Sequence, residues 1–114
     1  MSDPPIVQVE AARTFTRDLH TLAKKYRSIY QDVQPIIEEL QNGNIVGDQI
    51  PNIGYTVFKV RIRNTDIQKG KSGGYRLIYY LQTTTGIILL TIYPKSEQAD
   101  IDADEIKAII EQEE

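Results

Sequence analysis

The stretch from Tyr55 to Asn64 constrains the fold most, because apolar and cationic side chains alternate along it. Successive side chains of a strand point to opposite faces of a sheet, so this period of two residues predicts a strand. One face carries Phe58, Val60 and Ile62. The other carries Lys59, Arg61 and Arg63, with no carboxylate among them. The pattern predicts a sheet that packs one face on a core and presents a row of cations on the other.

The remaining elements follow from periodicity and turn residues. Strands are predicted over 6–10, 75–82 and 87–93, the last apolar enough to be covered on both faces. Helical spacing predicts helices from Thr14 to Tyr26, with Thr14 or Thr16 as its cap, and from Ile29 to Leu40. Pro35 implies that the second helix starts near residue 32 or kinks there. Asp102 is expected to cap a last helix.

These elements predict one α+β domain spanning residues 1–114. The expected order is β-α-α-β-β-β-α. Three consecutive strands joined by short turns form a small antiparallel sheet, and the helices pack on one of its faces to bury their apolar stripes.

Composition excludes several classes of function. The chain has no cysteine and one histidine, which excludes disulfides, thiolate zinc sites and multi-histidine metal sites. We therefore expect neither metal nor cofactor. Apolar runs are all shorter than the roughly 20 residues that span a bilayer. The short acidic N-terminus differs from a signal peptide, so we expect a cytoplasmic protein without membrane contact.

Charge is distributed unevenly along the chain. The net charge is −3. Residues 55–80 carry six cations and one anion, a balance of +5, whereas residues 97–114 carry eight anions and one cation, a balance of −7. The basic centre predicts a polyanion-binding surface. The acidic tail is either a solvated helix surface or a shield over the basic face when no polyanion is bound.

Residues 69–76, Lys-Gly-Lys-Ser-Gly-Gly-Tyr-Arg, combine three glycines with three cations. Glycine lets a backbone approach a ligand closely, and Lys and Arg supply charge for phosphate oxygens. A nucleotide-binding P-loop is excluded, because position 65 is threonine and a strand follows instead of a helix. The loop therefore either holds a phosphodiester or is only the tight turn of a hairpin. Among the tyrosines, Tyr80 shares a face with Arg76 and is a candidate for stacking on bases.

Several runs resemble the RelE/ParE superfamily of bacterial toxins, most closely its HigB-like branch. They are Phe58-Lys59-Val60-Arg61, residues 69–80, Tyr93-Pro94-Lys95-Ser96-Glu97 and residues 100–106. The resemblance covers about Val57 to Ile110. It implies a RelE-like fold and the toxin of a type II toxin–antitoxin system, an endoribonuclease (mRNA interferase) that cleaves mRNA, usually on the ribosome. The implied partners are a cognate antitoxin, mRNA and the ribosome.

The resemblance also implies site residues. The family arginine falls on Arg76, the basic residue after the last strand on Lys95, and the preceding lysines on Lys69 and Lys71. The C-terminal tyrosine of some relatives has no counterpart, since Ile101 stands there. Metal-free RNA cleavage needs a base, an acid and cations around the phosphorane.

We expect Arg76 and Lys71 to clamp the phosphate and Lys95 to stabilise charge or protonate the leaving group. Glu97 or Tyr93 is the candidate base. Lys59, Arg61, Arg63, Lys69 and Tyr80 are expected to bind RNA. The alternatives are a ParE-like inhibitor of DNA gyrase and a non-catalytic module that only binds an antitoxin.

Overall fold

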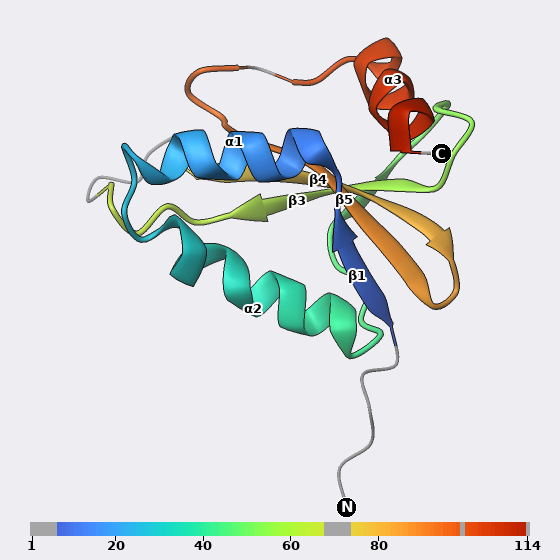
Figure 1. Ribbon diagram of the computed structural model, residues 1–114, viewed down its shortest axis with the longest axis horizontal. Coiled ribbons are helices and arrows are strands. Elements are labelled where there is room, and N and C mark those ends of the chain that lie inside the picture. The colour runs from blue at the N-terminus through green and yellow to red at the C-terminus, as the bar shows by residue number, and fades with distance from the viewer. Residues whose placement is uncertain (1–6, 68–73, 99, 114) are drawn as a thin grey trace, which may run out of the picture.

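A computed structural model describes residues 7–67, 74–98 and 100–113 of the chain. Eight elements follow one another in these residues (Figure 1). They are β1 (Gln8–Ala11), α1 (Arg13–Ala23), α2 (Ile29–Gln41), β2 (Asp48–Ile50), β3 (Val57–Ile62), β4 (Tyr75–Thr83), β5 (Gly86–Pro94) and α3 (Ala103–Glu113). The predicted α+β class is confirmed.

The strands form one five-stranded sheet in the order β1-β5-β4-β3-β2. The predicted meander of β3, β4 and β5 is antiparallel, but β1 joins the free edge of β5 in parallel, which makes the sheet mixed. The segment 48–50, which was not among the predicted strands, pairs with β3 as the short strand β2. The register of β4 on β5 shifts between Ile78 and Tyr79, so Leu90 is an extra residue in β5.

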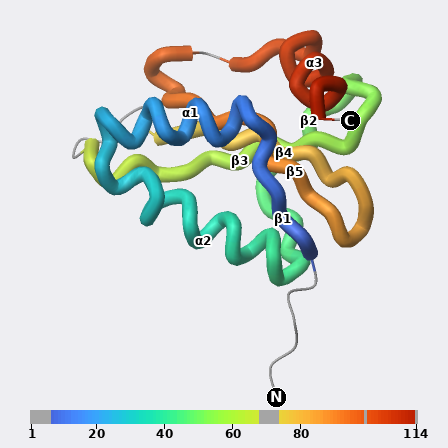
Figure 2. Tube along the Cα trace, viewed as in Figure 1, coloured from blue at the N-terminus to red at the C-terminus, as the bar shows by residue number. Residues whose placement is uncertain are grey.

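Both faces of the sheet are covered, and each has its own apolar cluster. Leu77 and Tyr79 of β4 face the side on which α1 and α2 pack, with Phe15, Leu22, Val33 and Leu40. Ile78 and Tyr80 face the other side, where Ile106 and Ile110 of α3 pack. The tube in Figure 2 shows α3 and α2 on opposite sides of the strands.

The sequence-based expectation placed all helices on one face. The apolar runs of β4 and β5 leave hydrophobic side chains on both faces, and burying the second set requires α3 on that side. The covered second face is also the face that carries the cations.

Helix ends match the expectations in part. Asp102 caps α3, since its Oδ1 accepts the N–H of Glu105 at 2.9 Å. The N-cap of α1 is Ala12, without a side-chain hydrogen bond, so the threonine cap expected there is not formed. Thr14 instead donates its hydroxyl to the carbonyl of Leu90 at the irregular point of β5. Helix α2 begins at Ile29 and contains Pro35.

Each helix in residues 7–67, 74–98 and 100–113 is too short or too polar to cross a bilayer.

Candidate nucleic-acid interface

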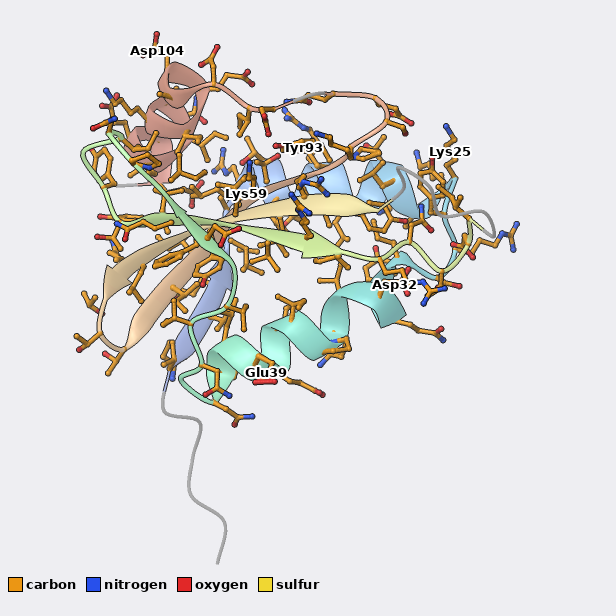
Figure 3. All side chains as sticks on the ribbon, turned by 180° about the vertical axis from the view of Figure 1, so that it is seen from behind. Lys25, Asp32, Glu39, Lys59, Tyr93 and Asp104 are labelled. Carbon is orange, nitrogen blue, oxygen red and sulfur yellow. The ribbon has the colours of Figure 1, made fainter. Side chains whose placement is uncertain are left out.

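The three central strands bring polar side chains together on the face that α3 covers. In the register of the sheet Arg61 lies opposite Arg76, and Arg76 lies opposite Tyr93. Lys59 pairs with Ile78, which places it on the same face two residues away from Arg61. We call Lys59, Arg61, Arg76 and the Tyr93 phenol the cationic face. Figure 3 shows Lys59 and Tyr93 on the side of the sheet opposite Asp32 and Glu39 of α2.

Arg76 is the most buried cation of this face, with 9% of its surface exposed. Its Nη1 donates to the carbonyl of Tyr75 at 3.4 Å, a long hydrogen bond. Among the described residues, Arg76 forms no ion pair with a carboxylate. A guanidinium has five N–H donors, and burying its charge without an anion costs free energy. The arrangement suits an anion that completes the site.

Tyr93 lies beside Arg76 and is 5% exposed. Burial raises the pKa of its phenol, and the nearby carboxylates of Asp100 and Glu105 act in the same direction. A hydrogen bond from the Ile101 N–H to Tyr93 Oη, 3.3 Å long, and the charge of Arg76 oppose the increase. The phenol therefore stays protonated near neutral pH and retains a proton to donate.

The described residues of the β5–α3 connection, 95–98 and 100–102, contact the cationic face at Lys59 and Tyr93 and also reach the end of α1. Asp100 Oδ1 lies 3.3 Å from Lys59 Nζ, with 61% and 32% of the two side chains exposed. Glu97 Oε2 lies 3.1 Å from Lys25 Nζ, a cation just after α1 that does not belong to this face. The hydrogen bond to Glu97 is the main cause of the raised pKa of Lys25. The sequence had indicated a row of cations without a carboxylate partner, and the acidic tail supplies one in space.

Gly74 fixes the edge of the face where β4 begins. Its φ is +97°, and a Cβ at this position would lie 2.6 Å from the carbonyl oxygen of Ile62. Only glycine combines this backbone conformation with such a close approach. The Gly74 carbonyl accepts the N–H of Lys95 at 3.0 Å. The end of β3, the start of β4 and Lys95 are thereby held together.

The structure groups some of the predicted residues and separates others. Arg76, Tyr93, Lys59 and Arg61 share the cationic face. Arg63 is exposed just beyond the end of β3. Tyr80 is 8% exposed and belongs to the core under α3, packed edge-on against Tyr55 with 5.4 Å between ring centroids. Lys69 and Lys71 lie outside the described residues.

Two contact residues were missed by the sequence reasoning. Lys25 lies 72 residues from Glu97, and Asp100 lies 41 residues from Lys59. Sequence patterns of short period do not reveal pairs at such separations. The available signal was the imbalance between a basic centre and an acidic tail, which indicates attraction but not which residues meet.

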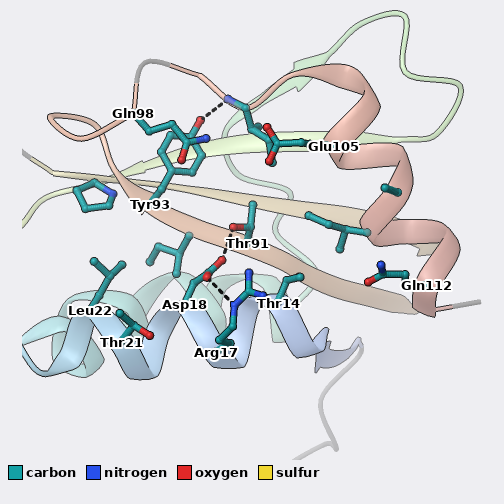
Figure 4. A pocket seen from close by; sticks show the side chains of 15 residues that line it. Thr14, Arg17, Asp18, Thr21, Leu22, Thr91, Tyr93, Gln98, Glu105 and Gln112 are labelled. Atoms are coloured by element: carbon teal, nitrogen blue, oxygen red, sulfur yellow. Dashed lines mark hydrogen bonds and ion pairs between the residues drawn. The ribbon is translucent and has the colours of Figure 1, made fainter.

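A pocket of about 470 Å³ adjoins this face between α1, β5 and α3 (Figure 4). Tyr93 forms part of its wall. Thr91 donates its hydroxyl to Asp18 Oδ2 at 2.8 Å, which ties β5 to α1 beneath the pocket. Within the described residues, no group of three or more His, Cys, Asp or Glu side chains could hold a metal ion.

The family of the chain is decided by a comparison with family models. The model of the RelE toxin of the RelE/RelB toxin–antitoxin system matches residues 12–112. The chain belongs to the RelE toxin family. This match confirms the resemblance found in the sequence and extends it to the N-terminal half.

Among solved structures, this RelE-family chain has weak similarity to TrmO from Pseudomonas aeruginosa, with 20% identity and a TM-score of 0.44. The match covers 82% of this chain and 37% of that one, so the chain spans little more than a third of that protein's length.

Proposed function

We propose that this RelE-family protein is the toxin of a toxin–antitoxin system and an endoribonuclease that cleaves mRNA. The observation that carries the assignment is Arg76, a buried guanidinium on the cationic face without a carboxylate partner among the described residues. Exposed surface cations are common, but a buried unneutralised one marks a place where an anion binds. A phosphodiester fits its forked donors.

RNA supplies its own nucleophile. In the proposed reaction the 2′-oxygen attacks the adjacent phosphorus, the bond from phosphorus to the 5′-oxygen breaks, and the products are a 2′,3′-cyclic phosphate and a 5′-hydroxyl. Negative charge grows on the non-bridging oxygens during the attack. Arg76 stabilises this charge, and the protonated Tyr93 phenol donates a hydrogen bond to the same phosphate. The side chains supply the proposed chemistry without a cofactor.

Two proton transfers complete the reaction. Lys95, next to Gly74 at the end of β5, donates a proton to the departing 5′-oxygen. The 2′-hydroxyl proton passes to the Glu97 carboxylate, which Lys25 orients at 3.1 Å. We favour Glu97 over Tyr93 as the base, because the raised pKa of Tyr93 disfavours the phenolate that a base requires. Lys71 remains a proposed second phosphate clamp.

The substrate and partners are proposed from the family. The family description names a toxin and an antitoxin, which supports a cognate antitoxin that holds this protein inactive. We propose mRNA on the ribosome, in the cytoplasm, as the substrate. Lys59, Arg61 and Arg63 then hold the strand on either side of the scissile phosphate.

The test is cleavage of a single-stranded RNA, free and on ribosomes, by purified protein, with the new ends identified as 2′,3′-cyclic phosphate and 5′-hydroxyl. Arg76→Ala and Lys95→Ala are expected to lower the cleavage rate at least about 100-fold. Arg13→Ala, an exposed cation at the first residue of α1, is the matched control and should cleave normally.

If Arg76→Ala and Lys95→Ala both cleaved RNA at the wild-type rate, the proposed active site would be wrong. Absence of cleavage by the wild-type protein, free and on ribosomes, would overturn the endoribonuclease assignment. A gyrase supercoiling assay on the same preparation distinguishes a ParE-like inhibitor.

A further inference from the structure

Asp100 lies at a position where a phosphate of the substrate is expected. Its carboxylate contacts Lys59 Nζ at 3.3 Å, and the N–H of the next residue, Ile101, donates to Tyr93 Oη at 3.3 Å. Two consecutive residues of the β5–α3 connection therefore engage two groups of the cationic face. A carboxylate and a phosphate make the same charge-assisted hydrogen bonds to an ammonium group. They compete for it.

We propose that Asp100 is an internal competitor for RNA, a carboxylate that occupies the phosphate position on Lys59 until a phosphodiester displaces it. This regulation rests on the proposed function, since it concerns the same RNA-binding face. Within the acidic residues 97–114, the proposal assigns the competition with RNA to Asp100, and Lys59 is the cation that Asp100 occupies.

Arg76 and Lys59 differ in whether a carboxylate of the described residues pairs with them. Arg76 is buried and has no carboxylate partner among the described residues, whereas Lys59 is paired. The two lie on diagonal positions of β3 and β4, and such positions are about 7–8 Å apart. Each can therefore hold a phosphate of its own. Arg76 is left ready for the scissile phosphate, and Lys59 receives the adjoining phosphate only after Asp100 leaves.

The competitor can leave without unfolding the domain. The pair is partly exposed, with 61% of the Asp100 side chain in solvent, and a pair of this kind is weak. Helix α3 keeps its own anchors, because Ile106 and Ile110 are each 1% exposed in the core. The Asp102 cap also remains. Displacement therefore requires only that the Asp100 side chain turn away from Lys59, while α3 stays in place.

The experiment measures binding of a fluorescent single-stranded RNA whose 2′-hydroxyls are methylated, so that it binds without being cleaved. Asp100→Asn removes the carboxylate charge and keeps the side-chain size. Asp104→Asn is the matched control, an exposed acid in the first turn of α3 that removes the same charge. Lys59→Gln, alone and combined with each variant, tests whether the effect passes through Lys59. Thermal unfolding of every variant checks that the fold is intact.

Asp100→Asn is expected to tighten binding about two- to fivefold at low salt, the range of a partly exposed ion pair. Asp104→Asn should change it less than twofold, and the gain from Asp100→Asn should vanish in the Lys59→Gln background. The proposal would be wrong if Asp100→Asn and Asp104→Asn changed RNA affinity equally. It would also be wrong if Asp100→Asn still tightened RNA binding in the Lys59→Gln background.

The two proposals fail separately in this design. Binding with the expected variant pattern but without cleavage of unmodified RNA supports the competitor and rejects the nuclease. Cleavage by a wild-type protein on which Asp100→Asn has no effect rejects the competitor alone. Absence of RNA binding by every variant rejects the competitor, and the cleavage assay on free and ribosome-bound RNA then decides the nuclease.

Discussion

Replacement of Arg76 by methionine should raise the stability of the fold and abolish RNA cleavage. The two effects have opposite signs because Arg76 is proposed to bind a phosphate, and no carboxylate of the described residues neutralises its charge. Arg76 is 9% exposed, and its hydrogen bond within the described residues is the 3.4 Å bond to the Tyr75 carbonyl. Methionine keeps an unbranched apolar stem of similar length in the same space.

The magnitude follows from three contributions. Loss of one long hydrogen bond costs at most about 1 kcal/mol. Removal of a buried unpaired charge recovers part of a desolvation penalty of several kcal/mol. Arg61 is directly opposite Arg76 in the register, and removing this like-charge contact adds roughly 0.2–1 kcal/mol. The expected net gain is about 1–2 kcal/mol, or roughly 4–8 °C in melting temperature for a domain of this size.

Thermal and urea unfolding measure the gain, and the RNA cleavage assay measures the loss. Arg13→Met is the matched control: Arg13 is exposed and lies away from Arg76, so the unfolding free energy of this variant should stay within about 0.5 kcal/mol of wild type. A melting temperature lowered by Arg76→Met would show that Arg76 stabilises the fold, and the reasoning from an unneutralised buried charge would be refuted.

Three further predictions test the framework around the face. Gly74→Ala should destabilise by at least about 2 kcal/mol in urea unfolding and slow RNA cleavage, because a Cβ would clash with a carbonyl at 2.6 Å. Gly54→Ala, at φ +86° with open space around it, should lose only about 1 kcal/mol; equal losses would contradict the clash. Asp102→Ala should cost about 1 kcal/mol by the same measurement, through loss of the α3 cap. Burial raises the pKa of Tyr79 from 10.0 to about 12, so the stability from its neutral phenol is complete below pH 10 and is lost as pH rises towards 12. Between pH 9 and 12 the wild-type unfolding free energy should fall by roughly 2–3 kcal/mol because of Tyr79, and Tyr79→Phe should not show this fall. The same dependence on pH in both proteins would contradict the assignment to Tyr79.

Much of the fold could be predicted from local pattern. The alternation through Phe58, Val60 and Ile62 identifies β3 because a strand repeats every two residues. The placement of Arg76 and Tyr80 on one face and of Tyr75 and Tyr79 on the other follows from the same period and is confirmed by the two apolar clusters. The Asp102 cap is equally local, since three residues separate donor and acceptor.

Long-range contacts had no such signal. The parallel pairing of β1 with β5 depends on which sheet edge stays open after the meander has formed. The side chosen by α3 depends on which face of β4 and β5 still exposes apolar side chains. Tyr80 is an example. The sequence made it a candidate for stacking on bases, but the packing of α3 on this face leaves it buried in the core.

The sequence by itself determined that Lys59 and Arg61 share one face of a strand and that Arg76 and Tyr80 share a face of the next, since a period of two residues is a local fact. Only the tertiary structure decided that Arg76 is buried without a described carboxylate, while Lys59 is paired with Asp100. Burial and ion pairing depend on distances between segments far apart in the chain. Hydrophobic packing of α3 on the second face fixes those distances, and this packing draws the acidic connection across the cations.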